Sequence, residues 1–494
     1  MTQRLDATRL ATLAARATVP EYQRDQVRVG QLHLGVGAFH RAHQALYTEE
    51  LLNRGDYYWG ICGVSLRSPA TRDRLTAQDL LYTVTECRDE HRQTRVVSAL
   101  QEIIVAPEEP GKVIERIADP AISVITLTIT EKGYALDPAS GELHRASPEI
   151  VRDLQNPGNP TTALGYLAAG LLARRERGAG GMTLLSCDNL AANGKKLRSA
   201  LLAFSEEVYP GLAEWIDDHC RFPCSMVDRI VPATTAADVE RLAAAIGVTD
   251  EAAVITEPFR QWVIEDNFAG PVPDWGSVGA TLVTDVAPFE TMKLRLLNAS
   301  HSCIAYLGCL AGFRTVADAV VAPGMQTLLQ KLMLEEMAPT LEGLEDFDVD
   351  SYCDALLNRF ANRGLAHHTA QIAMDGSQKI PQRLLPALKQ RLAQGENIDA
   401  SGLCLAAWFQ YLRAHDDSGN AIVIDDPMAE RFGTIAAAHG DDTAGYVDSL
   451  LGLEAIFDEP LATSTRLRDV LLESFSLAAL LHNRFPAATR TALL

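Results

Sequence analysis

Long hydrophobic runs are absent from this sequence of 494 residues. The longest nearly uncharged apolar stretches cover residues 163–173 and 302–313. Both fall short of the roughly 18 consecutive apolar residues that indicate a membrane-spanning helix. The sequence therefore predicts a chain without a membrane partner.

Cysteine and positive charge are also scarce. The nine cysteines are scattered, and their odd number argues against a disulfide framework. Cys220 and Cys224 are the one close pair, and no second Cys/His pair at zinc spacing follows them, so we expect no metal site. The chain has 44 basic and 64 acidic residues, which gives a net charge of −20. Such a chain repels phosphate backbones, and nucleic acid is therefore not an expected partner.

The rest of the composition is typical of a globular protein. Hydrophobic residues make up 47% of the chain and charged residues 22%, which is enough to build a large core. The length predicts two or three domains. The first twenty residues carry Asp6 and lack an apolar signal core, so we expect an ordinary first helix and a cytoplasmic protein.

The pattern of apolar and β-branched residues changes near residue 285. Before it, β-branched runs alternate with helical patterns, which predicts an α/β domain over residues 1–285 with a parallel sheet. Expected strands cover residues 27–34, 57–64, 121–130, 182–186 and 254–256, and expected helices cover residues 42–52 and 160–177. After it, apolar residues recur at the helix period, which predicts a mostly α-helical domain over residues 286–494. Its expected helices lie at 325–337, 354–361, 381–393, 403–413 and 466–481.

A glycine-rich turn follows the first expected strand. Gly35 and Gly37 fit the first two positions of the dinucleotide-binding pattern GxGxxG, and His40 stands at the third. The glycines would allow a tight turn and a close approach of a pyrophosphate, although a purely structural turn has the same pattern. The second strand ends at residues 65–68 without a carboxylate for the ribose of NAD, and Arg67 could meet a 2′-phosphate. The residues alone therefore leave NAD and NADP open.

Lys293, Asn298 and His301 follow the spacing K-x4-N-x2-H in an otherwise apolar stretch. On a single α-helix they would lie at about 0°, 140° and 80°, with Glu290 near 60°. A solvated amphipathic face would explain them. They would also suit hydride transfer, in which a lysine exchanges the hydroxyl proton, an amide stabilises the alkoxide and the imidazole holds the substrate. That chemistry needs no metal.

Seven segments, in order along the chain, resemble the mannitol dehydrogenase and fructuronate reductase family of long-chain, metal-independent polyol dehydrogenases. They read GVGAFHRAH, TLTITEKGY, SCDNL, FPCSMVDRIVP, EPFRQWVIEDNF, KLRLLNASH and DGSQK. The resemblance covers residues 30 to about 380 and implies a Rossmann-type NAD(P)-binding N-terminal domain and a helical catalytic C-terminal domain.

The resemblance also implies roles for single residues. It makes Lys293 the general acid/base, His301 the histidine that positions substrate and lysine, and Asp228 an active-site aspartate. Asn298 and Asn189 become the amides that stabilise the oxyanion, and Glu131 and Glu290 the carboxylates that gate a water path to the lysine. The cofactor turn is then Gly35, Val36, Gly37, Ala38, Phe39, His40 and Arg41.

The substrate remains open between a sugar acid and a neutral polyol. Members that act on mannitol tend to carry an aliphatic residue at Arg260 and an arginine at Gln371, so the resemblance favours D-fructuronate and D-mannonate over mannitol and fructose. We expect Arg260, Arg229 or Lys379 to hold the carboxylate, and NAD to be the cofactor, with NADP also allowed. A catalytically silent nucleotide-binding sensor and a zinc-dependent alcohol dehydrogenase are the alternatives from other classes. The expected assembly is a monomer or a small homo-oligomer.

Overall fold

The computed structural model describes residues 3–137 and 140–483. The chain divides into two compact units, an N-terminal unit over Met1–Ala287 and a C-terminal unit over Pro288–Leu494.

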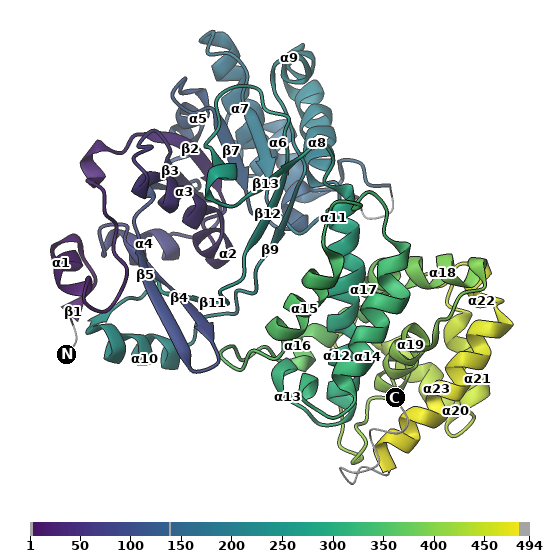
Figure 1. The fold of residues 1–494 in the computed structure, drawn as a ribbon. Helices are drawn as coiled ribbons and strands as arrows, with labels where there is room; N and C mark the ends of the chain where they lie inside the picture. The colour runs from purple at the N-terminus through teal and green to yellow at the C-terminus, as the bar shows by residue number, and fades with distance from the viewer. Residues whose placement is uncertain (1–2, 138–139, 484–494) are drawn as a thin grey trace. The chain divides into compact units, whose positions relative to one another are not determined.

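A parallel sheet of five strands forms the centre of the N-terminal unit (Figure 1). Its order is β6 (Leu100–Val105), β3 (Gly60–Ser65), β2 (Val29–Leu34), β7 (Val124–Leu127) and β8 (Thr183–Ser186). The strand order reverses between β2 and β7, and this reversal marks the edge at which Rossmann-type sheets bind ligands. The expected strands are confirmed, with ends that differ by a few residues.

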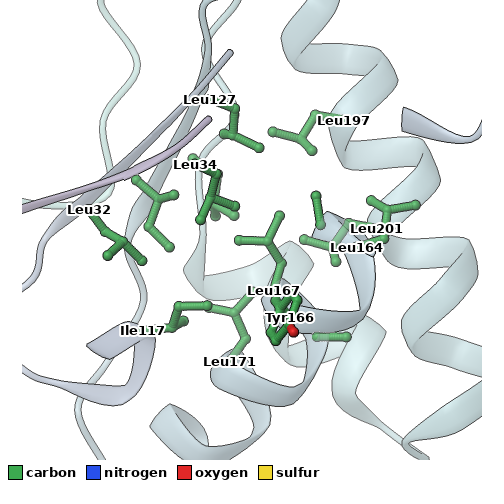
Figure 2. Close-up of a cluster of buried hydrophobic side chains, with 14 of the residues drawn as sticks. Leu32, Leu34, Ile117, Leu127, Leu164, Tyr166, Leu167, Leu171, Leu197 and Leu201 are labelled. Carbon is green, nitrogen blue, oxygen red and sulfur yellow. The ribbon is translucent and has the colours of Figure 1, made fainter. Parts of the chain in front are cut away.

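Apolar side chains from strands and helices make the main core of this unit. Leu32, Leu34 and Leu127 of the sheet pack against α7 (Ala163–Glu176) and α8 (Asn193–Val208), as Figure 2 shows. Every residue of β7 is buried, because helices cover both faces of a parallel sheet and leave no polar face.

Two smaller sheets in the N-terminal unit depart from the predicted parallel pattern. One joins β11 (Val254–Thr256), β4 (Tyr82–Arg88) and β5 (His91–Val97), and the other joins β13 (Thr281–Val283), β12 (Gln261–Glu265) and β9 (Ser225–Asp228). Each contains one antiparallel pair. The N-terminal segment, predicted as an ordinary helix, instead has the short strand β1 (Gln3–Arg4), a 3₁₀ turn over Ala7–Arg9 and the four-residue helix α1 (Leu10–Leu13) among its described residues.

The C-terminal unit is helical in its described residues, as predicted. Its central helix α12 (Ala299–Leu310) is buried on nearly all sides, and α16 and α17 lie beside it (Figure 1). An apolar surface all round is typical of a helix enclosed by others. The α-helices that follow α12 among the described residues are α13 (Val316–Val320), α14 (Met325–Gln330), α15 (Val349–Phe360), α16 (Thr369–Ala373), α17 (Gly376–Arg383), α18 (Leu385–Gln394), α19 (Asp399–Tyr411), α20 (Ala429–His439), α21 (Thr443–Leu451), α22 (Glu459–Ala462) and α23 (Thr465–Asn483). Among the described residues, no helix is both long and apolar enough to cross a bilayer.

Candidate active site

The glycine-rich turn lies at the edge where the strand order reverses. Gly35 has a φ of +99°, and a Cβ there would come within 2.1 Å of the carbonyl oxygen of Thr128. Its N–H donates to Val64 O at 2.9 Å, so the turn is fixed between the ends of β3 and β7. A Cβ on Gly37 would meet only Gly35 O at 3.9 Å. The backbone is therefore open above Gly37, as a bound pyrophosphate requires.

His40 and Arg41, both predicted to bind the cofactor, are engaged inside the protein. The His40 ring stacks on His33 with 3.3 Å between centroids and is almost fully buried. Burial, and then the neighbouring His33, hold the pKa of His40 well below its usual range, so this imidazole is neutral. Arg41 donates to Ala252 O and lies over the ring of Tyr82. These side chains support the turn from within, while Val36, Ala38 and Phe39 occupy the turn itself and the start of α2 (Ala38–Ala42).

Asn189 and Glu131 lie beyond the carboxyl ends of β8 and β7, and both are exposed. Asp188 links the two strand ends, because its carboxylate accepts from the backbone N–H groups of Ile129 at 3.0 Å and Thr130 at 2.8 Å. Thr130 has a φ of +63°, an uncommon backbone angle for a threonine. This link brings the segments that carry Asn189 and Glu131 to the same edge of the sheet.

Two of the cations predicted to hold a substrate carboxylate already bind carboxylates of the protein. Arg229 is fully buried and pairs with Glu86 at 2.6 Å, and its other donors bind the carbonyl oxygens of Glu257 and Ala42. Arg260 pairs with Glu50 at 2.6 Å. These contacts give both arginines an internal role. Asp228, beside Arg229, is buried at the end of β9.

The C-terminal unit gathers Lys293, Asn298 and His301, each only 8% exposed. The predicted single α-helix is wrong in one respect, because residues Lys293–Asn298 form a π-helical segment between α11 (Ala287–Met292) and α12. A π turn bonds residue i to residue i+5, so residues five apart lie closer in angle than the 140° of an α-helix. Lys293 and Asn298 are five apart, and His301 follows one turn later. Glu290 precedes them on α11 and is half-buried.

His301 is the most enclosed member of this group. Its ring lies 4.7 Å from that of Phe360 and 5.3 Å from that of His367. Burial is the main cause that holds its pKa well below the usual range, and His367, Arg383, Arg359 and Lys293 add to the effect. Its Nε2 is buried and has no hydrogen-bond partner within the described part of the chain. A neutral imidazole with an unused nitrogen can hold a substrate hydroxyl.

The remaining predicted residues lie on two neighbouring helices. Lys379 of α17 donates to Met374 O at 2.6 Å and Ile372 O at 3.3 Å, while Gln371 of α16 is exposed. Arg383, which no sequence motif above includes, donates to Asn298 O at 3.5 Å and Ser302 Oγ at 3.2 Å. Its signal was present, since it stands four residues after Lys379 and therefore on the same helical face.

No group of three or more metal-ligating side chains comes together within the described residues. The nine cysteines are free thiols.

The fold and site together define a class, an oxidoreductase with a Rossmann-type domain and a separate helical domain that carries a lysine, an amide and an imidazole. Family models agree with this class. Residues 29–277 match the mannitol dehydrogenase Rossmann domain, and residues 285–475 match the mannitol dehydrogenase C-terminal domain. The chain belongs to the mannitol dehydrogenase family.

Individual relatives cover nearly the whole chain. The D-mannonate oxidoreductase of Escherichia coli (strain K12) is 45% identical over 90% of this chain and 91% of its own. A mannitol 2-dehydrogenase of Phaeosphaeria nodorum is 40% identical over 87% of this chain and 76% of its own. The structure of Pseudomonas fluorescens mannitol 2-dehydrogenase with NAD and D-mannitol aligns with a TM-score of 0.83 and 36% identity, covering 97% of this chain and 98% of that one.

Proposed function

We propose that this chain is an NAD(H)-dependent, metal-independent oxidoreductase that interconverts D-fructuronate and D-mannonate. The observation that carries the proposal is the buried group of Lys293, Asn298 and His301 on and beside the π turn. The 45% identity to a D-mannonate oxidoreductase supports the sugar acid. The relative solved with NAD supports that cofactor, and the open backbone above Gly37 fits it.

Each residue has a task in the proposed reaction. The nicotinamide, when bound, supplies or accepts the hydride. During reduction Lys293, as ammonium, gives a proton to the oxygen of the substrate ketone as the alcohol forms. The amide of Asn298 donates a hydrogen bond to that oxygen while it carries negative charge. His301 holds a neighbouring hydroxyl. Oxidation needs Lys293 as the free amine, so it should speed up as the pH rises.

A mannitol 2-dehydrogenase is the second candidate. Relatives with that name align over most of the chain. In that case Arg260 would serve only to pair with Glu50 inside the protein, and Gln371 would be compatible with a neutral polyol.

The test is a spectrophotometric assay of cofactor reduction. D-mannonate, D-altronate, D-mannitol and D-arabinitol are each offered with NAD and with NADP, in the presence and absence of EDTA. We expect D-mannonate with NAD to give the highest kcat/KM, and EDTA to have no effect. A preference for D-mannitol would replace the first candidate with the second. The absence of turnover with every pair would favour a silent nucleotide-binding protein, and loss of activity with EDTA would favour a metal enzyme.

A further inference from the structure

Arg383 is a half-buried cation without a carboxylate partner among the residues that the structure describes. It ends α17 and donates through Nη1 alone, to the carbonyl oxygen of Asn298 and the hydroxyl of Ser302. Its Nε and Nη2 make no hydrogen bond there, and neither atom is fully buried. Two adjacent donors of a guanidinium therefore remain open, in the geometry that binds a carboxylate at two points.

Arg174 is a buried arginine with a structural role, and its hydrogen bonds can be compared with those of Arg383. That side chain is almost fully buried in the N-terminal unit and also lacks a carboxylate. Its Nε, Nη1 and Nη2 all donate to backbone carbonyl oxygens, those of Gly180, Ile117, Asp119 and Ala179. Arg383 is different, because most of its donors are unused. Burying a cation with unused donors is costly, and a bound anion would remove that cost.

The location of Arg383 suits the far end of a six-carbon acid. Its Nη1 contacts the backbone carbonyl oxygen of Asn298 at 3.5 Å and Ser302 Oγ at 3.2 Å, so the guanidinium lies beside the helical turn that begins at Asn298. Asn298 belongs to the group proposed to act on the reacting oxygen. In D-mannonate, four carbon–carbon bonds separate the reacting carbon from the carboxylate, so a cation that holds the carboxylate must lie near the reacting centre but outside contact with the reacting oxygen. A substrate with its alcohol at Lys293 and Asn298 can thus place its carboxylate at Arg383.

Independent observations indicate an anionic ligand here. His301, between Asn298 and Ser302, is 8% exposed and has an Nε2 without a partner within the described residues. The groups that act electrostatically on His301 are His367, Arg383, Arg359 and Lys293, and none of them is acidic. Three cationic side chains, Arg383, Arg359 and Lys293, are therefore near enough to act on this imidazole in a chain whose net charge is −20.

We infer that Arg383 binds the carboxylate of the substrate and thereby makes the enzyme selective for sugar acids over neutral polyols. This inference rests on the proposed function, because it names the residue that reads the acidic end of that substrate. It moves the carboxylate site from Arg260 and Arg229, which have internal partners, to the helical unit.

The test compares the wild type with Arg383→Gln, Arg383→Lys and the control Arg391→Gln. Arg391 is a buried arginine of α18 whose Nε donates to Asn397 O and whose Nη2 lies 3.8 Å from Glu396, so its variant reports the general cost of losing a buried cation with partners inside the protein. For each protein we would measure kcat and KM for D-mannonate and D-mannitol, the Kd of NADH and the melting temperature. Loss of charge-assisted hydrogen bonds predicts a rise in the D-mannonate KM of about 10- to 100-fold in Arg383→Gln. Arg383→Lys should recover part of it, and the D-mannitol kinetics and the NADH Kd should change less than about threefold.

The outcomes separate the two proposals. A wild type that prefers D-mannitol contradicts the proposed function itself. A wild type that prefers D-mannonate, combined with an unchanged D-mannonate KM in Arg383→Gln, contradicts only the role of Arg383. An equal loss on both substrates in Arg383→Gln, matched by Arg391→Gln, would show that Arg383 is structural.

Discussion

At the scale of single residues, the two glycines of the cofactor turn have different tasks that substitution can separate. In Gly37→Ala the new methyl group meets no atom closer than 3.9 Å, so folding should be unaffected. It would, however, stand where the pyrophosphate approaches the backbone, and we expect the Kd of NADH to rise at least about tenfold. Fluorescence titration with NADH and a thermal melt measure the two effects.

Gly35→Ala is the matched variant. Its methyl group would lie 2.1 Å from Thr128 O, at a φ of +99° that alanine rarely adopts, so this variant should melt at a lower temperature. A Gly37→Ala protein that binds NADH as tightly as the wild type would show that the turn does not hold the cofactor.

At the scale of elements, the π turn is the feature that sets the angle between Lys293 and Asn298. It contains one residue more per turn than an α-helix, so residues five apart share a face, and inserting an alanine after the half-buried Leu294 should rotate the lysine away from the amide. We expect kcat to fall at least about 100-fold while NADH binding in the N-terminal unit persists. Leu294→Ala, which keeps the residue count, should retain most of the activity. Equal activity in the insertion variant and the wild type would mean that the angle between Lys293 and Asn298 has no function.

Among the helices and strands, some could be predicted from the sequence and others could not. Buried runs such as β7 and β8 were predictable, because only β-branched and apolar residues suit a strand covered on both faces. The hairpin of β4 and β5 was missed, although its two-residue turn at Asp89 and Glu90, with Asp89 at a φ of +51°, has a recognisable pattern of polar residues between β-like runs. The π turn could not be predicted, since a helical wheel assumes a constant 100° per residue.

Some site residues could be predicted from the sequence and others could not, because only contacts between sequence neighbours leave a local pattern. Lys293, Asn298 and His301 are near neighbours in the sequence, so their spacing alone groups them. The partners of Arg229 and Arg260 are Glu86 and Glu50, which lie 143 and 210 residues away. No local pattern shows such pairs, and both cations therefore looked available for a substrate.

At the scale of the whole molecule, buried histidines should make the protein sensitive to acid. Burial lowers the pKa of His33 and His43 to about 3 and that of His367 to about 4, and holds those of His40 and His301 well below their usual range. These imidazoles stay neutral when folded but bind protons when unfolded below about pH 6.5. The unfolded state then binds more protons, so stability falls as the pH drops, by up to about 1.4 kcal/mol per pH unit for each histidine.

Glu49 acts in the opposite direction. Burial raises its pKa to about 7, so the folded state holds a proton that the unfolded carboxyl releases above about pH 4.5. Its contribution to stability is therefore present below about pH 4.5 and is lost as the pH rises through 7. Burial also raises the pKa of Asp188, Asp250 and Glu336, which act in the same direction as Glu49. The five histidines still outnumber these four carboxyls, so the melting temperature should fall from pH 7 to pH 5 at constant ionic strength. A constant melting temperature over that range would contradict the neutral, buried state of these rings.

The central claim is that Lys293 exchanges the proton of the reacting oxygen. Its most direct test is kcat for D-mannonate oxidation by wild type and Lys293→Ala at several pH values, with NADH binding and the melting temperature as controls. A general base contributes about 10²- to 10⁴-fold, so we predict a loss of at least about 100-fold with unchanged NADH binding. A variant that kept more than about a tenth of the wild-type rate would contradict the assignment of Lys293 as the acid/base.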